Sequence, residues 1–272
     1  GRRFKWPDYF FRGSWMIRGS KNKYIANHSS DFGQGFDLDD LEIKDEGGYY
    51  TFSSSGISLT QVITRDSRNH PEFPTSGSRS IWTSTLSGAL LGGNQDYHKH
   101  EFDFNWFTPL HKKFTISQIF KMGVLDKIEE QDGDRSIIPP SARFVMGGTG
   151  IPYGEMLRGY TENRVGPFGS TRGGNVMLKY SLEFRLSLSE NPTIYALSFF
   201  DMGNVWSSFD IVDPFDLKRS AGIGVRVFIP MLGMLGYDVG YGFDATDYDT
   251  YYNNGIVKPH GWEYHLIFGM PF

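Results

Sequence analysis

The sequence has no cysteine among its 272 residues, which excludes disulfide bridges, thiolate metal sites and a cysteine nucleophile. Positive charge is not in excess either, since 27 Lys and Arg residues stand against 31 Asp and Glu residues and both signs are mixed along the chain. A nucleic-acid-binding protein needs a basic surface, so nucleic acid is set aside as a partner. Long apolar runs are also missing. The best stretch, Val227 to Leu235, is interrupted by Pro230 and Gly233, whereas a membrane helix needs about 18 consecutive apolar residues.

The sequence also lacks the short motifs that are typical of common enzyme active sites. It contains no G-x-S-x-G elbow, no G-x-x-x-x-G-K-S/T loop and no H-E-x-x-H helix. We therefore predict no catalytic residue, no cofactor and no metal site. An enzyme barrel remains an alternative, because a barrel can assemble Ser, His and Asp from distant strands.

Aromatic residues make up 16% of the chain and glycine is abundant at 33 residues, a pairing expected where strands carry aromatic girdles and turn at glycine. The informative pattern is strict alternation. From Asn175 to Ser189, apolar residues hold every second position and polar residues hold the others, with Met177 as the apolar exception. Such a strand meets lipid with one face and a polar lumen with the other.

The last segment of the chain repeats this alternation. One face carries Trp262, Tyr264, Leu266, Phe268, Met270 and Phe272, and the other carries Glu263, His265, Ile267, Gly269 and Pro271. Two further segments, Lys99 to Trp106 and Tyr237 to Phe243, alternate in the same way. Four strands therefore show a face suited to lipid.

Six weaker strands are indicated by β-branched and aromatic residues between turn residues. They are predicted at Tyr9 to Ala26, Tyr49 to Arg65, Ser78 to Leu91, Phe114 to Lys127, Thr193 to Val205 and Arg219 to Ile229. Short and long links alternate between the later strands, which is the asymmetry of outer-membrane barrels. We predict an all-β fold, a transmembrane antiparallel β-barrel with about ten strands in this chain. A soluble β-sandwich also alternates and is the alternative, although the repeated aromatic residues favour lipid.

The longest link, Ile128 to Gly174, is expected to be functional or disordered because structureless connections of this length are uncommon. It contains Leu157-Arg158-Gly159-Tyr160. If Arg158 entered a polar lumen, its guanidinium would need a carboxylate to offset desolvation, and Asp201 and Glu183 are the candidates. A solvated surface loop is the equal alternative. The close pair His98 and His100 fits rim histidines better than a metal site, because no third ligand falls at a matching spacing.

Several segments together resemble the BamA superfamily of assembly and secretion barrels. The segments Ala142 to Gly148 and Leu157 to Tyr160 resemble the family motifs R-F-x-x-G-G and (V/L)-R-G-(F/Y), and Phe199 to Trp206 is similar to F-x-D-x-G-N-V-W. The segment Ser220 to Arg226 resembles S-x-G-x-G-x-R, and Thr64 to Ser78 resembles D-x-R-(N/D) followed by F-P-x-x-G. The motifs follow family order and cover nearly the whole chain.

The resemblance implies which residues carry the site. Arg158 would lie in a loop that folds back into the barrel and contacts the strand bearing Asp201, with Glu183 and Arg226 as further lumen partners. Trp262 to Phe272 would form the last strand, whose seam with the first strand opens sideways. Against the family, the chain begins around the seventh of sixteen strands. Residues 1–272 are thus expected to be the carboxy-terminal part of one barrel domain, without POTRA domains or the first strands.

The resemblance also implies a function. We expect the central barrel of an outer-membrane assembly machine, integral to the bacterial outer membrane, which folds and inserts client proteins by strand templating at its lateral seam. Expected partners are unfolded outer-membrane proteins, accessory assembly lipoproteins, outer-membrane lipid and lipopolysaccharide. A secretion pore or translocation channel of the same superfamily is the alternative. Gly269 and Pro271 fit a weakly paired seam edge, and equally a frayed chain end.

Overall fold

The computed structural model describes residues 1–5, 8–34, 36, 38, 41–88, 91–128, 137–167, 173–229 and 233–269. The strands are β1 (Arg2–Arg3), β2 (Phe11–Ala26), β3 (Lys44–Asp45), β4 (Tyr50–Asp66), β5 (Gly77–Ser87), β6 (Tyr97–His111), β7 (Phe114–Lys127), β8 (Val176–Glu190), β9 (Thr193–Trp206), β10 (Lys218–Ile229), β11 (Gly233–Gly242) and β12 (Gly261–Gly269). The helices are the short 3-10 turns η1 (Ser29–Gln34), η4 (Pro140–Ala142) and η5 (Phe209–Ile211), and α1 (Asp247–Tyr252).

All strands join one antiparallel sheet in chain order, with the two-residue strand β3 paired beside β4. The prediction of about ten strands in an all-β barrel wall is confirmed by the ten long strands, and only the two-residue strands β1 and β3 were not expected. The predicted strand from Ser78 to Leu91 ends at Ser87, because Gly88 takes a φ of 70° and turns the chain. Among the described residues, no helix is long and apolar enough to cross a membrane.

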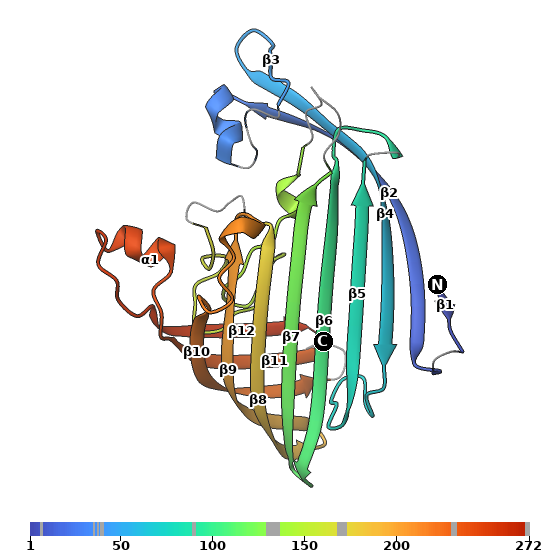
Figure 1. The fold of residues 1–272 in the computed structure, drawn as a ribbon. Coiled ribbons are helices and arrows are strands. Elements are labelled where there is room, and N and C mark those ends of the chain that lie inside the picture. The colour runs from blue at the N-terminus through green and yellow to red at the C-terminus, as the bar shows by residue number, and fades with distance from the viewer. Residues whose placement is uncertain are drawn as a thin grey trace.

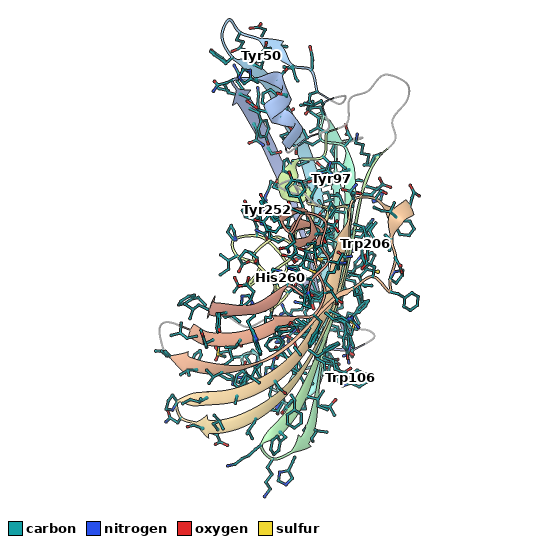
Figure 2. All side chains as sticks on the ribbon, turned by 90° about the vertical axis from the view of Figure 1, so that its left-hand side faces the viewer. Tyr50, Tyr97, Trp106, Trp206, Tyr252 and His260 are labelled. Atoms are coloured by element: carbon teal, nitrogen blue, oxygen red, sulfur yellow. The ribbon has the colours of Figure 1, made fainter. Side chains whose placement is uncertain are left out.

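The sheet curls strongly, so that β10, β11 and β12 run across the view behind β6 and β7 instead of alongside them (Figure 1 and Figure 2). Short links such as those between β6 and β7 and between β8 and β9 lie at one rim, and the long links lie at the other. In outer-membrane barrels the long loops are extracellular and the short turns periplasmic. The rim that carries α1 and η1 is therefore the extracellular one.

The wall is apolar outside and polar inside, the reverse of a soluble domain. On β8, Leu182 and Phe184 are exposed, whereas Glu183 and Arg185 on the opposite face are buried. A soluble sandwich would have sealed these apolar side chains inside, yet Phe268 on β12 is 63% exposed. The exposed face meets lipid, because a barrel wall turns apolar side chains to the hydrocarbon.

Large apolar side chains form an outward belt along the strands. Its exposed members include Trp15, Ile17, Ile57, Leu59, Trp82, Leu86, Phe102, Trp106, Met122, Leu182, Phe184, Leu188, Ile223, Tyr237, Trp262, Tyr264, Leu266 and Phe268. Side chains project from both faces of the wall along its whole length (Figure 2). The belt runs across consecutive strands, as the alternation in the sequence predicts.

Of the three apolar cores among the described residues, the two largest lie off this belt. One forms between the wall and the long loop that joins β7 to β8, and includes Met146, Leu157 and Tyr160. The other lies at the extracellular end of β2 and β4, where Phe32 and Phe36 pack around Phe52. The first core holds the candidate site in place.

Candidate functional site

The link between β7 and β8 folds back along the concave face of the sheet (Figure 1). The sequence suggested a structureless connection, but the described part of this link is ordered by pairing with itself. Gly148 forms a β-bridge with Leu157, and Met146 forms one with Val165. Met146, Leu157 and Tyr160 are fully buried. Their burial offsets the entropy of ordering so long a loop. We call residues 137–167 the inward loop.

Arg158 leaves the tip of the inward loop and enters the wall. Its Nε and Nη2 donate to the two carboxylate oxygens of Asp201 on β9, at 2.7 and 2.8 Å, and Nη2 also donates to Ser181 on β8 at 3.1 Å. Nη1 lies 2.7 Å from Glu183 Oε1, an ion pair without hydrogen-bond geometry. The structure thus brings Arg158 onto both carboxylates that the sequence proposed, in the bidentate geometry that suits a guanidinium.

The charges around Arg158 balance. Arg185 pairs with Glu183, with Nε at 2.8 Å from Oε2, and Arg226 pairs with Asp238, with Nη2 at 2.7 Å from Oδ2. Arg226 is linked to the inward loop through Asp238, whose Oδ2 lies 3.6 Å from Arg158 Nη1. We call these residues, with Arg158 and Asp201, the arginine cluster. Three guanidinium groups and three carboxylates offset one another, which buried charges require.

A ring and three glycines complete the seat of the loop tip. The Arg158 guanidinium lies over Phe199, 3.8 Å from the ring centroid. Gly159 has a φ of 81°, and a Cβ there would lie 2.8 Å from the Cβ of Ser220. Gly240 and Gly242 on β11 leave room for its backbone, since a Cβ on either would approach Gly159 within 3 Å. Only glycine fits this left-handed contact of backbone on backbone.

The residues after Gly159 continue onto the extracellular side of the wall. The Tyr160 hydroxyl donates to the backbone oxygen of Arg219 at 2.7 Å. Thr161 binds side chains near the last strand: its amide donates to His260 Nε2 at 3.2 Å and its hydroxyl donates to Glu263 at 2.8 Å. We call Leu157, Arg158, Gly159 and Tyr160, which are all held against the wall, the docked tip of the inward loop.

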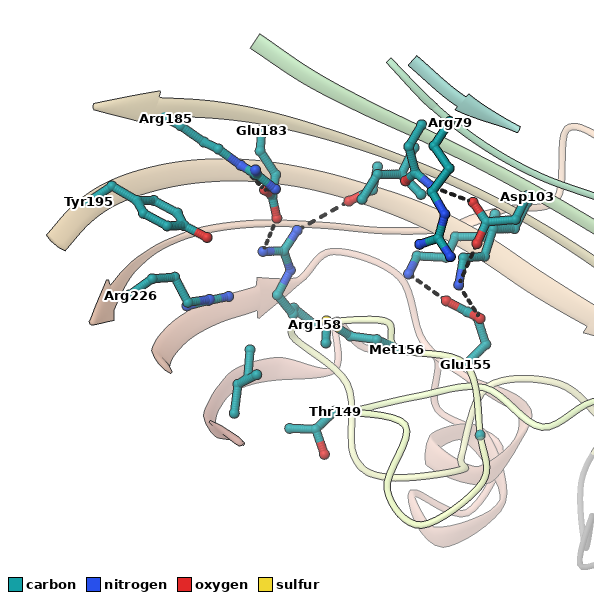
Figure 3. A pocket seen from close by; sticks show the side chains of 17 residues that line it. Arg79, Asp103, Thr149, Glu155, Met156, Arg158, Glu183, Arg185, Tyr195 and Arg226 are labelled. Atoms are coloured by element: carbon teal, nitrogen blue, oxygen red, sulfur yellow. Dashed lines mark hydrogen bonds and ion pairs between the residues drawn. The ribbon is translucent and has the colours of Figure 1, made fainter. Parts of the chain in front are cut away.

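A second charged group holds the base of the inward loop. Glu155 accepts from Lys121 on β7 at 3.0 Å and from Lys179 on β8 at 2.8 Å, and Lys121 also lies 3.3 Å from Asp103 on β6. We call these four residues the lysine cluster. Between it and the arginine cluster lies a cavity of about 300 Å³ (Figure 3). The two clusters anchor the loop at two points on the wall.

The last strand, β12, carries the residues proposed for the seam. Trp262, Tyr264, Leu266 and Phe268 point outward and are each about 60% exposed, and Gly269 has a φ of 115° with open space around it. Phe272 lies outside the described residues. Among the described residues β12 pairs with β11 alone, so its other backbone edge is unpaired there.

Several contacts of the site were missed by the sequence reasoning. Asp238 and His265 lie on the inner faces of alternating strands, so their burial was indicated, but their partners were not. Ser181 and Ser220 hold Arg158 and carry no pattern of their own. The described residues contain no group of three or more metal-binding side chains, and His98 and His100 lie side by side with ring centroids 5.4 Å apart.

Comparison with known proteins places this geometry in a family. The model of the Omp85 superfamily domain matches residues 16–263. The outer membrane protein assembly factor BamA of Nitratidesulfovibrio vulgaris is 27% identical over 227 residues, which cover 79% of this chain and 27% of that protein. A SAM50-like protein of Schizosaccharomyces pombe is 27% identical over 136 residues, 48% of this chain and 26% of that protein. The chain spans about a quarter of the length of these curated relatives.

A solved structure shares the fold. The crystal structure of BamA from Haemophilus ducreyi lacking POTRA domains 1–3 matches with a TM-score of 0.72 at 17% sequence identity, over 96% of this chain and 51% of that chain. The barrel wall, its outward apolar belt and these relatives identify an integral outer-membrane protein. The chain belongs to the Omp85 superfamily and has the barrel fold of BamA.

Proposed function

We propose that this barrel folds client outer-membrane proteins and inserts them into the bacterial outer membrane by templating their strands at the edge of β12. The observation that carries the proposal is the tie between β12, the last strand of the described sheet, and the inward loop, where the Gly159 amide donates to His265 on β12 at 2.9 Å. An incoming strand in lipid leaves unpaired backbone groups, each costing several kcal/mol. Pairing with β12 removes that cost during entry, and no catalytic residue is needed.

The inward loop supports the proposal because it is tied to the same strand. The Gly159 amide donates to His265 at 2.9 Å, and Thr161 donates to Glu263 at 2.8 Å. Movement of β12 at a seam therefore has to strain or release the docked tip. We propose that the arginine cluster keeps the tip in register while β12 exchanges partners. Gly269, which has no side chain to pack, weakens pairing near the end of this strand.

The proposed partners follow from this mechanism. Unfolded outer-membrane proteins supply the strands that pair with β12, accessory assembly lipoproteins deliver or position them, and lipid and lipopolysaccharide meet the outward belt. The relative from N. vulgaris is named an outer membrane protein assembly factor, which supports the assembly function at the level of the family.

A disulfide lock tests the proposal. The chain has no native cysteine, so Thr161→Cys with Glu263→Cys forms a single engineered pair between the inward loop and β12. Thr60→Cys with Thr85→Cys is the matched control, because their hydroxyls lie 3.0 Å apart on the adjacent wall strands β4 and β5. The full-length protein is reconstituted in liposomes, and insertion of an unfolded client barrel is followed by its protease resistance.

We expect the oxidised Thr161–Glu263 lock to stop insertion and reduction to restore it, while the control lock has no effect. Full insertion by the locked protein would show that β12 does not move away from the loop, and would sink the templating mechanism. A secretion pore would instead release its substrate across the membrane, so a client recovered inside the liposomes rather than in the bilayer would favour that alternative.

A further inference from the structure

Arg79 on β5 is a charged residue of the inner face that belongs to neither cluster. It lines the cavity of about 300 Å³ between the inward loop and the wall, together with residues of both clusters (Figure 3). Among the charged residues of the described chain that line this cavity, all except Arg79 belong to one of the two clusters. This single residue therefore decides the charge of the cavity.

The two clusters are each electrically neutral. The arginine cluster combines three guanidinium groups with three carboxylates, and the lysine cluster combines Lys121 and Lys179 with Asp103 and Glu155. Arg79 adds one positive charge that neither cluster offsets. Because a guanidinium stays protonated in proteins, this charge cannot be lost by titration.

The strand neighbours of Arg79 supply only a shared counter-charge. Asp66 faces it on β4 and interacts with its charge, but both Asp66 carboxylate oxygens are bound by Arg68, each at 2.9 Å, so one carboxylate serves two guanidinium groups. Asn105 faces it on β6 and is neutral, and its amide donates to Asp103 at 2.6 Å. The Nε atom of Arg79 is buried and has no hydrogen-bond partner among the described residues.

The other side of Arg79 is positive as well. A second cavity of about 430 Å³ borders it there, and Arg2, Arg3 and Arg12 line this cavity with Asp66. Since Asp66 is already held by Arg68, these arginines add to the positive potential around Arg79. A fixed cation in a confined, partly desolvated site is costly unless an anion joins it.

We propose that the cavity beside Arg79 binds a small soluble oxyanion of the phosphate type, held by the Arg79 guanidinium and the ammonium groups of the lysine cluster. The guanidinium offers a planar fork of donors that matches the oxygens of a phosphate group. A volume of about 300 Å³ lies at the small end of ligand sites, so it suits an ion of a few heavy atoms. The cavity lies between the inward loop and the inner face of the wall, on the opposite side from the exposed apolar belt, which favours a soluble ion over a lipid headgroup.

The bound anion has a structural consequence. The cavity is walled by Arg79, Lys121 and Lys179 on three strands and by Thr149 and Met156 of the inward loop. An oxyanion there bridges β5 to the loop, and no hydrogen bond or ion pair between described side chains makes this link. Occupancy therefore stabilises the docked loop, independently of whether the barrel inserts clients.

Calorimetric titration of the full-length protein in detergent micelles tests this, with pyrophosphate as the probe and a phosphate-free buffer. We expect saturable binding to the natural protein and slower hydrogen exchange of residues 149–158 when pyrophosphate is bound. Arg79→Gln should weaken binding at least about tenfold, while Arg79→Lys should retain part of it. Arg18→Gln is the control, because Arg18 lines a different lumen cavity.

Absence of saturable pyrophosphate binding to the natural protein would overturn the proposal, and this measurement needs no variant. Equal binding by Arg79→Gln, or equal weakening by Arg79→Gln and Arg18→Gln, would also overturn it, because the effect would then not belong to this site. Heat-modifiable migration of each variant on gels verifies that the barrel has folded. If Arg79→Gln does not fold, the natural protein and Arg79→Lys decide the question.

Discussion

The backbone amide of Gly159 donates a hydrogen bond of 2.9 Å to Nε2 of His265, across 106 residues of sequence. This contact joins the tip of the inward loop to the last strand of the wall. It requires Nε2 to be the unprotonated nitrogen of His265, since only an unprotonated ring nitrogen accepts a hydrogen bond. A change in the position of the loop tip therefore affects the last strand, and movement of the last strand affects the loop tip.

Replacing His265 with Ala should loosen the tip of the inward loop. The Gly159 amide then loses its buried acceptor, and a buried hydrogen bond contributes about 1 kcal/mol, so hydrogen exchange of residues 157–161 should speed up about fivefold. His265→Gln keeps an acceptor and should restore part of the protection. His28→Ala, in the extracellular link after β2, is the control. Unchanged exchange in His265→Ala would show that the tip is held by Arg158 without this contact.

Replacing Arg158 with Ala should destabilise the barrel strongly. Asp201 and Glu183 would remain buried without their shared cation, and breaking a buried ion pair from one side costs about 3–5 kcal/mol. Urea unfolding in micelles measures this. Arg219→Ala is the matched control, because its pair with Asp244 is exposed to solvent and should matter little.

The double variant Arg158→Ala with Asp201→Asn separates charge from packing. Removing Asp201's charge leaves less uncompensated charge, so the double variant should be more stable than the sum of the two single changes predicts. Strict additivity would mean that Arg158 acts mainly through its contact with Phe199.

Replacing Gly159 with Ala should undock the inward loop. Gly255 has the same φ of 81° but open space around it, so Gly255→Ala measures the backbone strain alone, about 1–2 kcal/mol. Gly159→Ala adds the clash with Ser220 and should cost clearly more in the same urea titration. Equal losses for the two variants would mean that the loop moves aside at no cost.

The extracellular link between β11 and β12 should open at acid pH. Burial of Asp249 favours its neutral form, but hydrogen bonds from the Thr246 backbone and from His260 outweigh this and lower its pKa below the usual 3.8. A lowered folded-state pKa stabilises the link above pH 3.8, and this contribution is lost as the pH falls through the folded pKa.

Limited proteolysis of residues 243–260 across this acid range measures the opening. Asp249→Asn should give about fivefold faster cleavage at neutral pH, because the charged hydrogen bonds are lost. It should also remove the increase in cleavage rate at acid pH, which we call the acid step. Asp247→Asn, on the same helix, is the control. An acid step that persists in Asp249→Asn would assign the transition to another group.

The order of the strands and the direction of their side chains could be predicted from the sequence because both are local. Alternate side chains of a strand point to opposite faces, so the apolar positions from Leu178 to Leu188 marked the lipid face directly. The proposed partners of Arg158 could also be named, because a buried guanidinium requires carboxylates and few lie on an inner face.

The seat of the loop tip could not be predicted in the same way. Asp238 and His265 lie far from Arg158 in sequence, and their role depends on how far the sheet curls. Gly240 and Gly242 read as ordinary strand glycines, yet they matter because the backbone of Gly159 lies against them. Such contacts depend on register between strands that no local pattern encodes.

The sequence by itself determined that this chain forms a long-stranded wall with an apolar outer and a polar inner face, because side-chain alternation needs only neighbouring residues. The tertiary structure alone decided which inner charges meet. Curling of the sheet brings β5, β7, β8, β9, β11 and β12 around one loop, and among the described residues it leaves the Nε atom of Arg79 without a hydrogen-bond partner. Charge pairing acts over a few ångströms in space, whatever the separation along the chain.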